Sequence, residues 1–333
     1  MLVLNQNEVT ELLPMSACID VMASALATLA RGDAVLPLRT VVVYPDGTGA
    51  FAVMPAYLGT PKTVGAKVVT VVPGNHGTEF DSHQGAVLLF DSKNGSLVAI
   101  LDATPVTAIR TAAVSAVATR ELARENASSL AIIGSGVQAL THLEAMCAVR
   151  PIKTLRIYSR NRANCQKLAD VAKKKFSLDA SVSENGQDAV RNADIVCTTT
   201  SSKEPVLFGE WLTPGTHINA VGSSQAHARE LDSAAVVRSR VYVDRRESAL
   251  NESGDMLVPL RAGDIGPDHI VGEIGDLLLG RAPRRGSDLE ITLFNSLGLA
   301  IEDLAAASYV YDQAVRRGIG TNVMLGGARS AAH

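Results

Sequence analysis

Two basic side chains lie in stretches that are otherwise apolar. Lys67 is the one charged residue in Val64–Val72, and Arg110 is the one charged residue in Ala103–Thr119. A buried ionised group needs a partner of opposite charge, and a guanidinium can hold a carboxylate through two parallel hydrogen bonds. The alternatives are a lysine that reaches water at a sheet edge and an internal pair between Arg110 and Asp102. We favour the interpretation in which both cations contact a small anionic ligand.

The segment Gly134-Ser-Gly-Val-Gln-Ala139 carries a second kind of chemistry. It follows a short apolar run, Leu130–Ile133, and precedes an apolar-periodic stretch, so the pattern predicts a strand, a glycine-rich turn and a helix. This is the G-x-G-x-x-G/A arrangement of dinucleotide-binding proteins, in which Gly134 makes the turn and Gly136 admits the pyrophosphate. The free N–H groups at the helix N-terminus favour the same anion.

The end of the next predicted strand distinguishes between the two nicotinamide cofactors. An Asp or Glu at this place binds the ribose 2′-hydroxyl of NAD. Here the sequence is Tyr158-Ser-Arg-Asn-Arg162, with two guanidiniums and a hydroxyl but no carboxylate. We therefore expect NADP(H) to be preferred, with NAD(H) as the alternative cofactor. The other interpretation is that Arg160 and Arg162 begin a solvated helix.

Length and composition exclude several classes of protein. A chain of 333 residues is long enough for about two domains. With 47% hydrophobic and 20% charged residues it has the composition of a globular protein with a large core. The formal net charge of -3 offers no basic surface, so we expect no nucleic-acid partner. The four cysteines are scattered and form no C-x-x-C pair, no metal is expected, and no apolar run reaches membrane length. We expect a cytoplasmic enzyme without a membrane partner.

The predicted elements fall into two patterns. A strand at 2–4 and a helix at 16–31 are followed by apolar runs joined by hairpin turns, up to residue 101. A helix then begins, with Thr104 predicted at the N-cap and Pro105 at the first position. From residue 130 strands and helices alternate, which predicts a parallel, doubly wound sheet with six strands up to residue 243. We expect loops over 251–266, a last helix over 299–316 that packs back on the first domain, and fraying of the final residues.

Together these motifs resemble the ornithine cyclodeaminase/μ-crystallin family over nearly the whole chain. The segments that carry the resemblance are Pro37–Arg39, Met54–Ala56, Gly65–Lys67, Pro73–Asn75, Thr107–Ala113, Gly134–Ala139, Arg229–Asp232 and Ser296–Asp303. The resemblance implies an α/β fold in which a Rossmann domain at 124–301, for NADP(H), is inserted into a discontinuous α+β domain. That second domain, 1–123 with 302–333, would bind the substrate and pair its sheet with a partner's in a homodimer.

The resemblance also assigns site residues. Arg39, Lys67 and Arg110 would surround the substrate, with the two arginines on its carboxylate. The residues expected near the cofactor are Ser82, His83, Thr111, Gly134, Ser135, Gly136, Val137, Gln138, Ser159, Arg160, Asn161, Arg162, Thr198, Thr199, Val221, Gly222 and Ser296.

One departure from the family pattern bears on the reaction. The cyclodeaminases carry a catalytic aspartate in a segment that corresponds here to Gly222–Leu231, where Ser224 stands in its place. A serine cannot act as a carboxylate base. The chain therefore resembles the ketimine-reductase branch, which reduces cyclic α-imino acids, with Ser224 as a fourth catalytic candidate. His227 and His83 are the other possible proton donors. The alternatives are a cyclodeaminase or dehydrogenase acting on an open-chain amino acid, and a non-catalytic NADP(H)-dependent binder.

Overall fold

The computed structural model describes residues 1–75 and 77–325 of the chain. These residues divide into two compact units. Unit 1 comprises residues 1–110 and the segment from Leu299 onward, and unit 2 is Thr111–Gly298. The predicted domain boundaries, at 123/124 and 301/302, lie further along the chain. The first of them could not be read from the sequence because the observed boundary falls inside a continuous helix, α3 (Ala103–Leu122). Fraying was expected for the final residues of the chain. Residues 326–333 lie outside the described residues.

Unit 1 is built on one mixed sheet in the order β16-β1-β7-β6-β5-β4-β2, with β3 also paired to β4. Its strands are β1 (Leu2–Leu4), β2 (Ala34–Val35), β3 (Thr40–Val43), β4 (Ala50–Gly59), β5 (Lys62–Val71), β6 (His83–Phe90), β7 (Leu97–Asp102) and β16 (Thr321–Asn322). Strand β1 is parallel to β7, and the other pairs are antiparallel. The hairpin pattern of the sequence is thereby confirmed, and β5 lies between β4 and β6.

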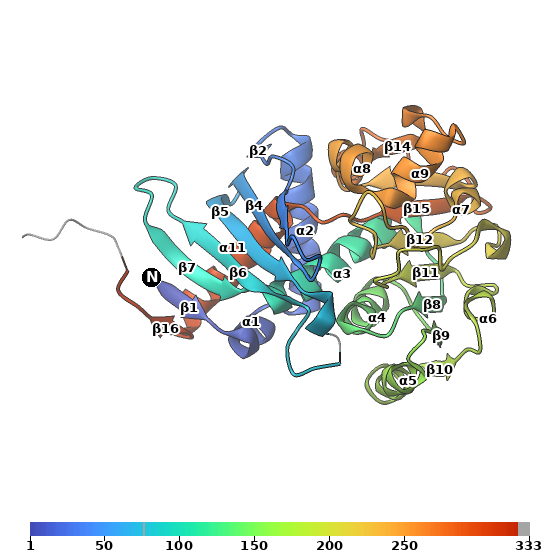
Figure 1. The fold of residues 1–333 in the computed structure, drawn as a ribbon, viewed down its shortest axis with the longest axis horizontal. Helices are drawn as coiled ribbons and strands as arrows, with labels where there is room; N and C mark the ends of the chain where they lie inside the picture. Colours follow the sequence, from blue (N-terminus) through green and yellow to red (C-terminus); the bar gives the residue numbers. More distant parts are fainter. Residues whose placement is uncertain (76, 326–333) are drawn as a thin grey trace, which may run out of the picture. The chain divides into compact units, whose positions relative to one another are not determined.

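The helices of unit 1 are α1 (Gln6–Leu12), α2 (Met15–Ala30), the first part of α3, and α11 (Ala300–Arg317). Helix α11 packs against β4, β5, β6 and α2, so the C-terminal segment does return to the N-terminal unit (Figure 1). The sequence interpretation missed α1, although Asn5 and Glu8 form a capping box at its start. The prediction of Thr104 as the N-cap of α3 was wrong. The helix begins at Ala103, and the Asp102 carboxylate accepts the Thr104 N–H at 2.8 Å.

Unit 2 contains a parallel sheet in the order β10-β9-β8-β11-β12-β15-β13-β14. Its strands are β8 (Ser129–Ile133), β9 (Thr154–Tyr158), β10 (Asp179–Val182), β11 (Ile195–Thr198), β12 (His217–Ala220), β13 (Ser239–Val243), β14 (Ile270–Glu273) and β15 (Ile291–Asn295). The chain runs outward from β8 through β9 to β10 and then resumes with β11 on the other side of β8. This reversal defines a doubly wound fold and confirms the predicted Rossmann class.

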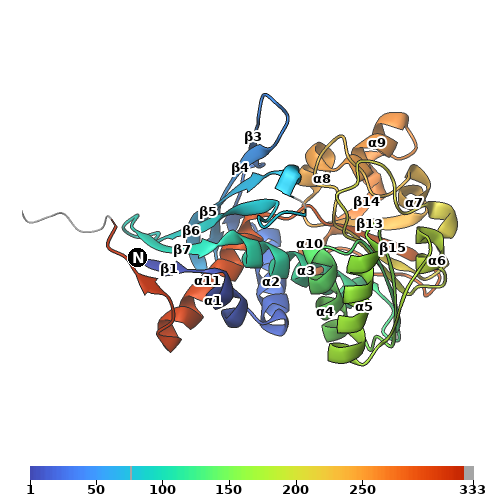
Figure 2. The same cartoon turned by 60° about the horizontal axis from the view of Figure 1, so that its bottom comes forward.

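The helices of unit 2 cover its sheet on two sides. They are α4 (Val137–Val149), α5 (Arg162–Phe176), α6 (Gly186–Val190), α7 (Ser233–Val237), α8 (Arg246–Glu252), α9 (Gly254–Ala262) and α10 (Ile274–Leu278). Figure 1 shows α4 and α5 on one side and α6 and α7 on the other, and Figure 2 shows α4 and α5 lying side by side. The predicted sixth strand, β13, is separated from β12 by β15, which arrives from much later in the chain.

The prediction of loops over 251–266 was wrong. Much of this stretch forms α9, which begins after Ser253, whose side chain accepts the Met256 N–H, and ends at Gly263 with a φ of 79°. The polar and glycine residues that suggested loops are therefore the caps of a short helix. Met256 and Leu257 lie on its buried face.

Within the described residues, no single helix is long and apolar enough to cross a membrane. Only α1 and α2 taken together satisfy the length and composition criteria, and the two helices are bent by 81° relative to each other.

Candidate active site

Lys67 lies in the middle of β5 and is 4% exposed. Because β5 is an interior strand, the interpretation of Lys67 as a sheet-edge lysine that reaches water was wrong. Its Nζ lies 2.9 Å from Asp303 Oδ2 and 3.5 Å from Thr107 Oγ1. The counter-charge that a buried ammonium requires therefore comes from α11, more than two hundred residues away in the chain.

Arg110 points to the same two-carboxylate segment of α11. Its Nε donates to Asp303 Oδ1 at 2.9 Å, and its Nη1 donates to Glu302 Oε2 at 2.7 Å. The alternative pairing with Asp102 was wrong, since the Asp102 side chain bonds the backbone at the start of α3. Both Glu302 and Asp303 are fully buried. With two of its nitrogens already donating to carboxylates, Arg110 is held rigidly rather than presented as an open fork.

These four groups form a charge-balanced cluster, Lys67–Asp303–Arg110–Glu302, referred to below as the ion cluster. Burial lowers the pKa of Lys67 from 10.5 to about 8, the negative charge of Asp303 opposes that shift, and Arg110 and Arg39 add to it. Burial alone would raise the pKa of Asp303, but Arg110 and Lys67 outweigh burial and hold that pKa below its ordinary value. Arg39 is half-buried in the segment between β2 and β3, close enough to the ion cluster for its charge to act on Lys67.

Sequence reasoning did not identify Glu302 and Asp303 as members of the site. The available signal was a pair of adjacent carboxylates in the otherwise apolar run Leu299–Ala307. Two buried carboxylates in a helix face need two cations, and Lys67 and Arg110 were the two that lacked partners in the sequence interpretation. Assigning the two carboxylates to the two cations would have identified the ion cluster from the sequence.

In unit 2, the two fingerprint glycines are required for different reasons. Gly134 has a φ of 126°, and a Cβ there would lie 2.5 Å from Thr199 Oγ1, so both the backbone and the packing require glycine. Nothing lies within 4 Å of the Cβ position of Gly136, the N-cap of α4. The fold itself therefore leaves space at Gly136, as the close approach of a pyrophosphate demands. This geometry fits a dinucleotide at the edge where the strand order reverses.

The predicted 2′-phosphate residues surround the turn after β9. Ser159 Oγ lies 2.6 Å from Ser135 Oγ, so this hydroxyl borders the fingerprint turn. Asn161 caps α5, and Arg162, the first residue of that helix, pairs with Glu184 at 2.9 Å. Both side chains of this pair are more than half exposed, and exposed pairs contribute little stability. Arg162 can exchange this partner for a phosphate at small cost, and Arg160 is exposed beside it.

The remaining predicted residues lie in several different places. Ser224 is half-buried and His227 is exposed, on a loop closed by a hydrogen bond from Ser223 Oγ to Ala228 O. In unit 1, Ser82 Oγ lies 3.1 Å from His83 Nδ1 at the start of β6. In unit 2, Thr198 is the last residue of β11. The residues that follow β8, β11, β12 and β15 are Val137, Gln138, Thr199, Val221, Gly222 and Ser296. Thr111 is buried in α3.

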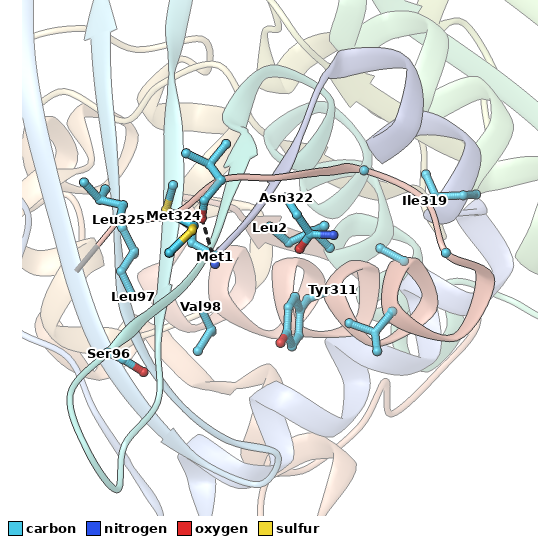
Figure 3. Close-up of a pocket in the computed structure, with 15 residues that line it drawn as sticks. Met1, Leu2, Ser96, Leu97, Val98, Tyr311, Ile319, Asn322, Met324 and Leu325 are labelled. Carbon is cyan, nitrogen blue, oxygen red and sulfur yellow. Dashed lines mark hydrogen bonds between the residues drawn. The ribbon is translucent and has the colours of Figure 1, made fainter. Parts of the chain in front are cut away.

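A pocket of about 550 Å³ opens elsewhere in unit 1, between the ends of β1, β7, α11 and β16 (Figure 3). Polar and apolar surface contribute equally to its lining, and Leu2, Val98 and Tyr311 are among the residues that face it. No acidic or basic side chain contributes to that lining. None of the predicted site residues line this pocket.

The fold and the two sites define a two-unit protein with a Rossmann unit for a dinucleotide and a second unit with a buried ion cluster. The family model of the ornithine cyclodeaminase/mu-crystallin family matches residues 1–318. A ketimine reductase mu-crystallin of Mus musculus is 42% identical over 300 residues, covering 89% of this chain and 92% of the relative. The chain therefore belongs to the ornithine cyclodeaminase/mu-crystallin family.

Two solved structures extend the comparison. The Thermococcus litoralis Δ1-pyrroline-2-carboxylate reductase in complex with NADH and L-proline matches with a TM-score of 0.95 and 39% identity, over 97% of this chain and 100% of that one. An archaeal alanine dehydrogenase dimer with bound NAD matches with a TM-score of 0.92 and 32% identity, over 98% and 99%.

Proposed function

We propose that this protein is an oxidoreductase that reduces the C=N bond of a cyclic α-imino acid with NADPH. The substrate would be Δ1-pyrroline-2-carboxylate or Δ1-piperideine-2-carboxylate, and the product L-proline or L-pipecolate. The observation that carries the proposal is Lys67, a buried ammonium with a pKa of about 8 that is fixed beside Arg110. The similarity to a reductase solved with NADH and L-proline supports it.

Each residue of the site has a distinct part in this reaction. Arg39, with support from Arg110, holds the substrate carboxylate and so orients the ring. Lys67 donates a proton to the ring nitrogen, because an ammonium whose pKa lies near neutral pH can both hold and release one. When bound, the nicotinamide supplies the hydride that the imine carbon accepts. One hydride and one proton together convert the C=N bond to an amine.

Ser224 is the residue that separates this proposal from cyclodeamination. Its hydroxyl can hydrogen-bond the ring nitrogen or a water, but it cannot serve as the carboxylate base that removal of an amino group needs. A dehydrogenase acting on an open-chain amino acid remains the second candidate, favoured by the match to an alanine dehydrogenase. The two are distinguished by whether cyclic or open-chain substrates are turned over.

The preference for NADPH rests on the turn after β9, where Arg160 and Arg162 stand and no carboxylate follows the strand. The related structures hold NADH or NAD, so use of a nicotinamide dinucleotide has broader support than the 2′-phosphate. We propose that the 2′-phosphate displaces Glu184 from Arg162.

A homodimer is the assembly that we propose. The structure of an archaeal alanine dehydrogenase dimer is among the matches. In unit 1, β3 exposes three consecutive valines, Val41, Val42 and Val43, at 47%, 57% and 66% of their surface. An apolar strand of this kind is a surface that association would cover.

The test is an NADPH-oxidation assay with five- and six-membered cyclic imino acids. Lys67→Met should lower kcat/KM by about 100-fold or more, the usual contribution of a general acid. Lys62→Met is the matched control because Lys62 is exposed at the start of the same strand, and it should behave as wild type. Full activity in Lys67→Met, or a wild type inactive on every cyclic imine, would overturn the proposal.

A further inference from the structure

Glu230 is a fully buried carboxylate that the proposed mechanism does not use. Four donors converge on it. Thr198 Oγ1 and the Gly222 N–H donate to Oε2 at 2.7 and 2.6 Å, and the N–H and hydroxyl of Thr200 donate to Oε1 at 2.6 and 2.7 Å. Hydrogen bonds to an ionised acceptor are short and about twice as strong as neutral ones. One of the donors ends strand β11, and the others lie in the loops just beyond β11 and β12.

These two loops follow adjacent parallel strands. Thr198 ends β11 and Thr200 lies just beyond it, while Gly222 lies just beyond β12. Glu230 therefore ties the two loops together at the carboxyl edge of the sheet, the edge where doubly wound folds bind their ligands. The segment from Gly222 leads directly to Ser224, so the same carboxylate fixes the base of the loop that carries this residue.

Packing around the carboxylate is close. A Cβ at Gly222 would lie 2.0 Å from Thr200 O and 2.6 Å from Glu230 Cδ, so glycine is required there. Thr199, between the two tethered threonines, donates its N–H to Ile133 O at 2.8 Å, and its hydroxyl borders Gly134. The tethered loop and the fingerprint turn are consequently in direct contact.

A second buried carboxylate supports the first. Asp255, near the start of α9, accepts the backbone N–H groups of Glu230 and Leu231 through Oδ1, at 2.8 and 2.9 Å. Its other oxygen lies 3.4 Å from Asn295 Nδ2, at the end of β15. Glu230 is thus fixed at its backbone by Asp255 while its side chain fixes the two loops.

We infer that Glu230 is a positioning residue for the nicotinamide half of the dinucleotide. In this fold the pyrophosphate binds at Gly136, and the adenosine binds on the β9 side of the point where the strand order reverses. The nicotinamide half should therefore contact the loops after β11 and β12, which Glu230 joins. This inference rests on the proposed function only in taking unit 2 as the unit that binds a nicotinamide dinucleotide.

The experiment measures ligand binding in the absence of any imine substrate. NADPH is titrated by its own fluorescence against wild type, Glu230→Gln and Asp232→Asn, and 2′-phospho-ADP-ribose, which lacks the nicotinamide, is titrated by competition. Asp232→Asn is the matched control, because this nearby carboxylate accepts N–H groups from Gly209 and Ala235 and none from the two loops. Melting temperatures are recorded for each protein.

Glu230→Gln should raise the Kd of NADPH about tenfold or more, since an amide cannot accept from all four donors and one hydrogen bond to a charged group contributes that factor. The Kd of 2′-phospho-ADP-ribose should change less than about threefold, because the lost bonds lie on the nicotinamide side. Asp232→Asn should leave both constants unchanged even if its melting temperature falls.

Unchanged NADPH affinity in Glu230→Gln, or equal losses for both ligands, would overturn the inference. If that variant does not fold, Thr198→Val removes a single donor to Glu230 from a strand position that suits valine, and the same split between ligands is expected. A wild type that binds NADPH but reduces no cyclic imine would contradict the proposed function and leave this inference standing.

Discussion

Asp303→Asn tests whether the ion cluster sets the protonation of Lys67. The substitution removes the charge that lies 2.9 Å from Lys67 Nζ and keeps the shape of the side chain. Two unit charges 4 Å apart interact by about 4 kcal/mol at an effective dielectric constant near 20, and 1.36 kcal/mol corresponds to one pKa unit. After a discount for relaxation around the new amide, the pKa of Lys67 should fall by about 2 units, because Asp303 raises it.

The assay is the pH profile of kcat/KM for imine reduction, in which the alkaline limb reports loss of the proton from Lys67. That limb lies near pH 8 in wild type if Lys67 is the donor. In Asp303→Asn it should move to about pH 6, so the variant should be about 50-fold slower at pH 8 and recover most of this loss at low pH. Titration of the substrate itself cancels because both proteins receive the same compound.

Glu302→Gln is the control for this experiment. Glu302 is equally buried on the same helix, and its carboxylate pairs with Arg110 Nη1 at 2.7 Å. Its pH limb should stay where the wild-type limb lies, although the KM for the imino acid rises as Arg110 loosens. Identical limbs in wild type and Asp303→Asn, with both proteins folded by circular dichroism, would refute the assignment of Lys67 as the proton donor.

Three further predictions concern other parts of the chain. Arg160→Asp should reverse much of the preference for NADPH over NADH in kcat/KM, and a wild type that favours NADH would contradict the 2′-phosphate site. Wild-type protein given L-ornithine and catalytic amounts of cofactor should release no ammonia, whereas ammonia at a useful rate would mean that Ser224 has been misinterpreted. Burial raises the pKa of Asp255 from 3.8 to about 7, so its ionisation opposes folding increasingly as the pH rises from about 4 to 7. Asp255→Asn should therefore remove this decline, so that its melting temperature relative to wild type increases from about pH 4 to pH 7. An unaltered pH dependence would count against a protonated Asp255.

The sequence by itself determined most of the local structure and the class of the fold. Alternation of apolar runs with turns predicted the hairpins of unit 1, and strand–helix alternation predicted the parallel sheet of unit 2, because these patterns report which face of each element is buried. The fingerprint was equally readable, since the conformation of Gly134 depends on residues next to it in the chain. The resemblance to the family followed from such local motifs.

Only the tertiary structure decided which charges meet. Lys67, Arg110 and Asp303 come from a strand and two helices, and a sequence pattern does not report the distance between such elements. The same holds for Glu230, whose side chain joins the ends of β11 and β12, and for β15, which enters the sheet between strands that precede it. A buried charge can be recognised from its apolar neighbours, but its partner is fixed by packing across the fold, and that packing sets the pKa of Lys67.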